Sequence, residues 1–237
     1  ISFLSVEEEY TAGMFSREAR VKIQELFQAN EVVVVVGGSM LYMDALLYGL
    51  DELPGDKEIR NTLNHRCELE GLSVLVEELK AKDSDFASRV DLENAHRVIR
   101  ALEVIQITGK SFTELRTQSS DAIDAKIIHV FLSGDREWVY NRINVRVDKM
   151  VEDGLFKEVE ELLPLRNLHA LNTVGYKEVF THLYGNCTKE EAIAEVKKNT
   201  RNYAKRQMTW YRNKSHVRQF DVQMGDVSAE IISLLSN

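Results

Sequence analysis

Glu31-Val-Val-Val-Val-Val-Gly-Gly-Ser39 is the stretch that decides the fold prediction for this chain of 237 residues. Its five valines are β-branched and uninterrupted, which is typical of a strand covered on both faces and therefore central in a parallel sheet. Helices are predicted on either side, over residues 12–29 and 40–48. The order helix, buried strand, glycine turn, helix predicts an α/β protein. Loops at the carboxyl ends of such strands carry ligands, so residues 37–39 form a candidate site, with a plain turn as the alternative.

Helical patterns without intervening strands follow Pro54-Gly55. The spacing of apolar residues and the glycine stops predict three helices there, at about residues 56–70, 72–81 and 93–108. Further strands and helices are then predicted, the strands at 126–132 and 217–222 and the helices at 135–154, 155–163 and 189–212. We therefore expect an α/β core made of residues 1–53 and 123–237, interrupted by an all-helical insertion over residues 54–122.

Charge is distributed unevenly along the chain. The formal net charge of -8 argues against a protein that holds nucleic acid over its whole surface, because phosphate binding depends on Lys and Arg. Residues 196–220, however, contain no Asp or Glu and eight Lys or Arg side chains. The C-terminal quarter is therefore a basic island within an acidic chain.

Composition also bears on where the protein resides. The longest apolar run, residues 32–36, is far shorter than the roughly 20 residues that cross a bilayer, and the acidic N-terminal region does not resemble a secretion signal. Two cysteines, Cys67 and Cys187, are too few for a disulfide framework or a zinc site. We expect a globular protein of the reducing cytoplasm, without a membrane span.

Two basic helices are candidates for anion binding. Arg142 and Arg146 lie one turn apart on the helix predicted from 135, where two guanidinium forks could clamp a diphosphate; solvated surface charge is the alternative. On the helix at 189–212, cations are interleaved with Tyr203, Trp210 and Tyr211. This mixture suits a structured RNA with splayed bases, although the aromatics could instead anchor the core.

His96, Arg100 and Glu103 share one face of the helix predicted at 93–108. A metal site would need more ligands, so we interpret these side chains as polar contacts to a substrate or to one another.

Five strings, taken together, resemble the bacterial tRNA dimethylallyltransferases, also called tRNA isopentenyltransferases. They are Gly37-Gly-Ser-Met-Leu-Tyr42, His96-Arg-Val-Ile-Arg-Ala-Leu-Glu-Val104, Arg142-Ile-Asn-Val-Arg-Val-Asp-Lys-Met150, Thr173-Val-Gly-Tyr176 and Lys205-Arg-Gln-Met-Thr-Trp210. The resemblance extends from about Tyr10 to Trp210. It implies a P-loop kinase-like parallel sheet flanked by helices, with a helical insertion that binds the anticodon stem-loop. The implied reaction transfers a dimethylallyl group from dimethylallyl diphosphate to the N6 amine of the adenosine 3′-adjacent to the anticodon.

The resemblance also implies roles for individual residues. Ser39 stands where the family usually has a threonine that contacts the reacting adenosine, and Arg146, with Arg142 beside it, matches the arginine used on the diphosphate. The family usually has glutamine at the position of His96. The implied tRNA contacts are Arg60, Ala95, His96, Arg97, Val98, Ile99, Asn172, Thr173, Val174, Gly175, Tyr176, Lys177, Lys205, Arg206, Gln207, Met208, Thr209, Trp210, Tyr211 and Arg212.

The family's phosphate-binding loop, of the form GxxxxGK[ST], and the aspartate that serves as its general base are not found in these 237 residues. The resemblance places both in an N-terminal segment, together with most of the contacts to Mg²⁺, so we expect these 237 residues alone to bind or catalyse poorly. The implied protein is a monomer. Two other functions stay open from the residues themselves: a small-molecule phosphotransferase of the same fold, which would not need the basic island, and a non-catalytic RNA-binding protein.

Overall fold

A computed structural model describes residues 3–51, 53–115, 123–212 and 214–235, which fold into two compact units. One unit contains the chain up to Thr11, Val36–Met40 and the chain from Asp124 onward; the other contains Ala12–Val35 and Leu41–Ile123. The division of the sequence at residues 53 and 122 stays a prediction.

Helices α1 (Ala12–Phe27) and α2 (Met40–Tyr48) belong largely to the second unit and are joined by side chains of α1. The Ser16 hydroxyl donates to the carbonyl oxygen of Ala45 at 2.7 Å, and the Arg20 guanidinium donates to that of Leu46 at 2.8 Å. The Ala45 carbonyl oxygen also accepts from the Gly49 amide at 3.1 Å, and both side-chain bonds lie near the end of α2, where a helix has carbonyl groups free to accept them. Both predicted helices are confirmed.

The same unit contains a bundle of helices around one apolar core. Its members are α3 (Lys57–Glu70), α4 (Leu72–Lys82), α5 (Ser84–Ala87), α6 (Ala95–Thr108) and α7 (Phe112–Leu115). Leu63, Leu75, Leu79 and Leu102 are fully buried in it, and each such side chain contributes about 1.5–3 kcal/mol of transfer free energy. The Asp56 carboxylate caps α3 by accepting from the amides of Glu58 and Ile59. The three helices predicted for this region are confirmed.

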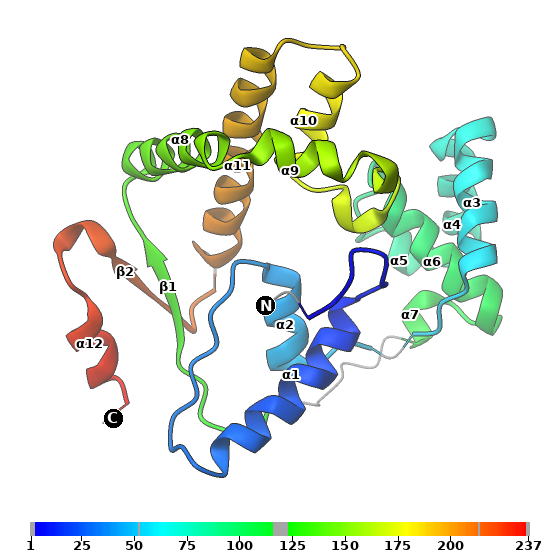
Figure 1. Ribbon diagram of the computed structural model, residues 1–237. Helices are drawn as coiled ribbons and strands as arrows, with labels where there is room; N and C mark the ends of the chain where they lie inside the picture. The colour runs from blue at the N-terminus through cyan, green and yellow to red at the C-terminus, as the bar shows by residue number, and fades with distance from the viewer. Residues whose placement is uncertain (1–2, 52, 116–122, 213, 236–237) are drawn as a thin grey trace. The chain divides into compact units, whose positions relative to one another are not determined.

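The first unit contains a parallel pair of strands, β1 (His129–Ser133) and β2 (Val217–Asp221), drawn as adjacent arrows in Figure 1. His129 is in register with Val217, and Ser133 with Asp221. The strand predicted at 217–222 is confirmed, while the one predicted at 126–132 begins three residues later. A parallel pair with helices between its strands in sequence confirms the α/β class.

Four longer helices accompany the strands. They are α8 (Arg136–Glu152), α9 (Leu155–Glu161), α10 (Tyr176–Leu183) and α11 (Lys189–Arg212), followed in the chain by the short α12 (Ser228–Ser233). Asp135 caps α8, as predicted, by accepting from the amides of Glu137 and Trp138. Short 3₁₀ turns lie at Leu163–Leu165, His169–Leu171 and Val222–Met224. Leu155, Val159 and Val179 are among the buried side chains that hold α9 and α10 together.

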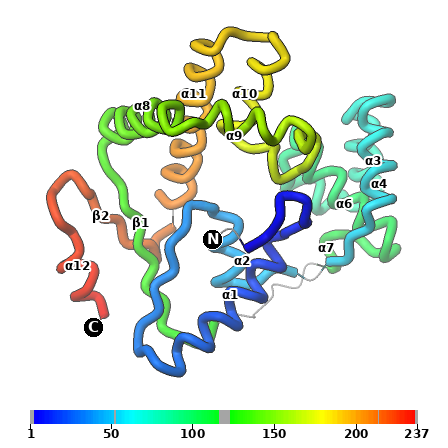
Figure 2. The backbone as a smooth tube through the Cα atoms, in the orientation of Figure 1, coloured from blue at the N-terminus to red at the C-terminus, as the bar shows by residue number. Residues whose placement is uncertain are grey.

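The valine run is the main correction to the predicted fold. Residues 32–36 form an extended loop without strand pairing, visible in Figure 2 as the tube between α1 and α2, and the side chains of Val34 and Val36 are 79% and 90% exposed. A strand is stable only when neighbours take up its backbone hydrogen bonds, and within the described parts of the chain only β1 and β2 pair. Composition favoured a strand here, but among the described residues no strand pairs with this segment.

Candidate functional site

The loop that contains Ser39 is attached to helix α11. Tyr203 donates its hydroxyl to the carbonyl oxygen of Gly38 at 3.0 Å, and the side-chain amide of Gln207 donates to the same oxygen. A Cβ added to Gly38 would lie 2.8 Å from the Gln207 nitrogen, closer than such contacts allow. A side chain at position 38 would require the Gln207 amide to move, and two side chains one turn apart on α11 bind the backbone immediately before Ser39.

Ser39 is half-buried and directly precedes the first residue of α2. Its position next to a carbonyl group held by two hydrogen bonds restricts where its hydroxyl can lie. The turn at residues 37–39 is thus more than a plain connection, although its contact with a substrate stays a prediction.

Helices α8 and α11 pack against each other through polar contacts. Arg201 donates to the side-chain oxygen of Asn144 at 2.8 Å, and Lys197 forms an ion pair with Asp148 at 2.6 Å. The Arg201 guanidinium also lies over the Tyr140 ring, 5.9 Å from its centroid. These two cations of the basic island thus serve partly to join the helices.

Arg142 and Arg146 are both exposed on α8. Arg142 lies over the ring of Trp138, 4.8 Å from the centroid, a contact that leaves its charge available. Val147, which follows Arg146 in sequence, is 1% exposed and holds α8 in place from its buried face. Both arginines are thus exposed at positions one helical turn apart on α8, and their use as a clamp for a diphosphate stays a prediction.

The segment 205–212 divides into exposed and buried side chains. Lys205 and Arg206 are exposed, and Trp210 is 43% exposed beside the Lys214 ammonium group. Tyr211 is only 5% exposed and stacks on Phe131 of β1, with ring centroids 4.9 Å apart. The aromatics therefore split between the two predicted roles: Tyr211 anchors the core, whereas Trp210 presents a ring at the surface. Of the remaining positions, Met208 is half-buried and Thr209 and Arg212 are exposed.

The segment 172–177 leads into α10. Asn172, Thr173, Val174 and Lys177 are exposed, whereas Gly175 is buried with a φ of 102°, a conformation that favours glycine. The Glu178 carboxylate accepts from the amide of Gly175 at 2.8 Å and from Asn199 of α11 at 2.7 Å.

Tyr176 donates a hydrogen bond to the Glu158 carboxylate of α9. This bond, together with burial and the nearby charge, raises the pKa of Tyr176 to about 12. The tyrosine therefore stays protonated and joins α9 to the start of α10.

At the start of α6, the predicted contacts Ala95–Ile99 also differ in exposure. His96 and Arg97 are exposed, Ala95 is half-buried, and the side chains of Val98 and Ile99 are buried in the helical core. Any contact to RNA from the last two positions would have to come from the backbone.

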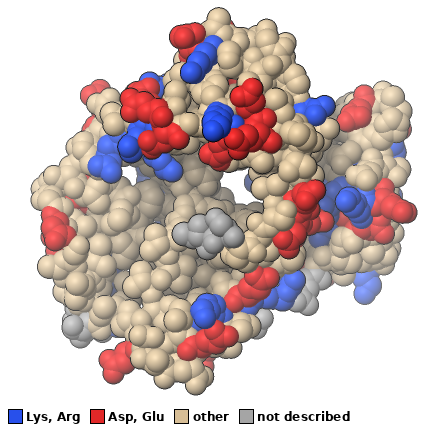
Figure 3. Space-filling model, viewed as in Figure 1, with Lys and Arg blue, Asp and Glu red and all other residues tan. Residues whose placement is uncertain are grey.

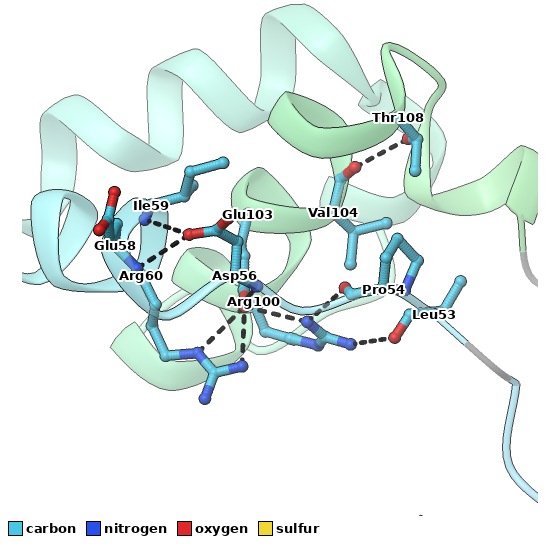
Figure 4. Close-up of polar contacts among 10 residues, drawn as sticks. All are labelled: Leu53, Pro54, Asp56, Glu58, Ile59, Arg60, Arg100, Glu103, Val104 and Thr108. Carbon is cyan, nitrogen blue, oxygen red and sulfur yellow. Dashed lines mark hydrogen bonds and ion pairs between the residues drawn. The ribbon is translucent and has the colours of Figure 1, made fainter.

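Further along α6, the carboxylate of Glu103 is fully buried and binds two arginines. Arg60 donates two hydrogen bonds to it, at 3.0 and 3.1 Å, and Arg100 forms an ion pair with it at 3.0 Å (Figure 4). Burial raises the pKa of Glu103, but the bonds from Arg60, the Asp56 amide and Arg100 outweigh it, so the pKa is below the usual value. The sequence placed Arg100 and Glu103 on one face, and their ion pair confirms that they contact one another. It gave no sign of the bond to Arg60, which is 43 positions away.

Cations do not form one continuous face on the side shown in Figure 3, where Lys and Arg alternate with Asp and Glu. Among the described residues, no three His, Cys, Asp or Glu side chains gather closely enough to hold a metal ion. None of the described helices is long and apolar enough to cross a membrane.

Comparison with known proteins gives one consistent result. The profile of the IPP transferase family matches residues 1–214. The tRNA dimethylallyltransferase of Christiangramia forsetii is 44% identical to this chain, over 93% of this chain and 74% of the relative. The tRNA dimethylallyltransferase 1 of Bacteroides thetaiotaomicron is 42% identical, over 93% of this chain and 72% of the relative. The crystal structure of the full-length tRNA isopentenylpyrophosphate transferase from Bacillus halodurans superposes with a TM-score of 0.66, at 32% identity, over all of this chain and 75% of that one.

Proposed function

The chain belongs to the IPP transferase family, and from this premise we propose that it transfers a dimethylallyl group from dimethylallyl diphosphate to the exocyclic N6 amine of the adenosine 3′-adjacent to the anticodon in tRNA. The observation that carries the proposal is the family match, which spans the Ser39 loop, the Arg146 helix and the basic helix α11. The protein is accordingly an enzyme, a prenyltransferase that modifies tRNA.

In the proposed reaction, the lone pair of the N6 amine forms a bond to the allylic carbon while the bond from that carbon to the diphosphate oxygen breaks. The bonding electrons leave with the diphosphate, whose negative charge grows. The amine proton passes to a general base, for which the family resemblance implies an aspartate. Mg²⁺, carried by the diphosphate, would supply further charge neutralisation.

Within this chain, Arg146 is proposed to bind the diphosphate oxygens as their charge increases, with Arg142 one turn away as a second donor. Guanidinium groups suit this role because their parallel N–H groups match two phosphate oxygens at once. Ser39 is proposed to contact the adenosine through its hydroxyl. The two bonds to the carbonyl oxygen of Gly38 support this assignment, since they hold the backbone before Ser39 in one place.

We assign tRNA binding to the helical region 54–122 and to the exposed parts of the segments 95–99, 172–177 and 205–212. Lys205 and Arg206 would contact backbone phosphates, and the exposed ring of Trp210 would stack on a base. Bringing the target adenosine to the donor requires flipping it from its loop, which costs a few kcal/mol. The proposal includes a monomeric, cytoplasmic protein, in keeping with its two free cysteines.

The proposal is tested by incubating the intact natural protein with labelled dimethylallyl diphosphate, Mg²⁺ and tRNA that lacks the modification. Label in the RNA fraction is the expected result. A parallel reaction with labelled ATP and small nucleotides tests for phosphoryl transfer. Phosphorylated nucleotides without labelled tRNA would replace the proposal with a phosphotransferase, and tRNA binding without either product would replace it with a binding protein.

A further inference from the structure

Glu103 is a completely buried carboxylate whose two oxygens are fully engaged. Oε1 accepts from the Asp56 amide at 2.8 Å and from Arg60 Nη2 at 3.0 Å, while Oε2 contacts Arg60 Nε at 3.1 Å and Arg100 Nη1 at 3.0 Å. A buried carboxylate is costly unless it is paired and hydrogen-bonded, so this complete set of contacts holds its partners in a defined geometry.

The two arginines are held differently. Arg100 uses its Nη1 and Nη2 nitrogens on the carbonyl oxygens of Pro54 and Leu53, at 2.9 Å each, so it fastens the segment before α3 to α6. Within the described residues, the Arg60 side chain forms its hydrogen bonds and ion pair with Glu103 alone, through Nε and Nη2, and it is 43% exposed. In Figure 4 its remaining nitrogen points away from the carboxylate. Arg60 therefore keeps unused N–H groups on its outer edge.

Two guanidinium groups face the carboxylate of Glu103, while the nearby Asp56 carboxylate is engaged in capping α3. The backbone also passes close to both cations: a Cβ at Gly55 would lie 3.3 Å from Arg60 Nη2 and 3.4 Å from Arg100 Nη1. The result is a fixed guanidinium fork on Arg60, whose free edge matches the paired oxygens of a phosphate group.

We propose that Glu103 is a positioning residue for tRNA binding: it holds Arg60 with its outer edge directed at a phosphate of the RNA backbone. The inference rests on the proposed function, because the phosphate is one of the tRNA substrate. Glu103 does not itself touch the RNA. Its role is to remove the rotational freedom that an exposed arginine would otherwise lose on binding.

The test compares tRNA affinity and its salt dependence, by filter binding or fluorescence anisotropy, in the intact protein and in single variants. Arg60→Ala should weaken binding by about tenfold and reduce the salt slope by about one phosphate contact. Glu103→Gln keeps the size of the side chain but replaces one acceptor by a donor, and it should weaken binding several-fold with a similar change in slope. Glu25→Gln is the control, since Glu25 holds Lys22 in an ion pair on α1, outside the segments assigned to tRNA, and this variant should bind tRNA like the parent.

A double-mutant cycle separates positioning from general stability. If Glu103 acts through Arg60, adding Glu103→Gln to Arg60→Ala should cause no further loss of tRNA affinity. Additive losses, or a Glu103→Gln protein that is folded and binds like the parent, would overturn the proposal. If Glu103→Gln does not fold, Arg60→Lys tests the proposal instead, because lysine keeps the charge of Arg60 but lacks the guanidinium fork. An Arg60→Lys protein that binds tRNA with parental affinity would also overturn the proposal.

The outcome for the proposed function is read separately, from prenyl transfer by the parent protein. A parent that labels tRNA, with unchanged binding in the Arg60 and Glu103 variants, would leave the function standing and remove the inference. A parent that does not label tRNA would remove the function itself.

Discussion

Gln207 and Gly38 lie 169 positions apart in the sequence, yet the side-chain amide of Gln207 donates a hydrogen bond to the carbonyl oxygen of Gly38. Tyr203 donates to the same oxygen from the preceding turn of α11. The family resemblance assigned Gln207 to tRNA contact. In the structure its amide holds the loop that contains Ser39, so the helix that carries the basic island also determines the geometry of the proposed catalytic loop.

Replacing Gln207 by alanine should lower turnover several-fold, because the Gly38 carbonyl keeps only the bond from Tyr203 and Ser39 becomes less fixed. tRNA affinity should change much less. Steady-state kinetics of prenyl transfer, together with tRNA binding, measure both. Gln24→Ala, on the exposed surface of α1, is the control. A loss confined to tRNA affinity, with normal turnover at saturation, would show that Gln207 is a substrate contact only.

Gly38→Ala should also reduce turnover, because the new Cβ would lie 2.8 Å from the Gln207 nitrogen and displace this amide from the Gly38 carbonyl oxygen. The defect should be smaller when Gln207 is already alanine, since the clash is then removed. The measurement is kcat for the two single variants and the double variant. Strictly additive losses would mean that the two residues do not interact in the working enzyme.

Arg146→Ala should lower kcat by about 100-fold with little loss of tRNA affinity, as expected when a donor to the developing charge of the leaving group is removed. Single-turnover transfer and equilibrium tRNA binding separate the two effects. Arg166→Ala, which removes another exposed arginine of the same unit, should leave kcat unchanged. Normal turnover in Arg146→Ala would exclude Arg146 from the mechanism.

Lys205→Ala and Arg206→Ala should each weaken tRNA binding and reduce the dependence of affinity on salt by about one phosphate contact. The slope of log affinity against log salt concentration measures this directly. Lys22→Ala serves as the control because Lys22 is paired with Glu25 on the surface of α1, outside the segments assigned to tRNA. A slope equal to that of the parent protein would place these side chains outside the RNA contact.

Asp83→Asn tests the acid sensitivity of the helical unit. Burial raises the pKa of Asp83, but hydrogen bonds from the Phe86 amide and from Thr113 lower it more, so the folded-state pKa is below the usual value of about 4. The charged carboxylate therefore stabilises the fold above that usual pKa, and the contribution is lost as the pH falls through the lower folded-state pKa.

In thermal unfolding at neutral pH, Asp83→Asn should be destabilised by about 1–3 kcal/mol. The difference from the parent should shrink as the pH is lowered below about 4. A difference that stays constant across that range would mean that the charge of Asp83 does not contribute. Glu77→Gln, at an exposed position, should follow the parent at every pH.

The sequence predicted the helices well because their signals are local. The spacing of apolar residues, a cap at Asp135 and the Gly109 stop each act within a few residues, and the structure confirms them. The prediction of a strand at 31–36 was wrong, because a strand depends on pairing with distant segments that composition does not reveal. The hydrogen bonds from Gln207 to Gly38 and from Arg60 to Glu103 could not be predicted for the same reason, because they join residues far apart in the chain.

Nuclease digestion of the reacted tRNA, followed by mass spectrometry of its nucleosides and mapping of the modified position, tests the central claim most directly. The intact protein, supplied with dimethylallyl diphosphate and unmodified tRNA, should produce N6-dimethylallyladenosine at the position 3′-adjacent to the anticodon. Unmodified adenosine at that position, or a dimethylallyl group attached elsewhere in the RNA, would contradict it.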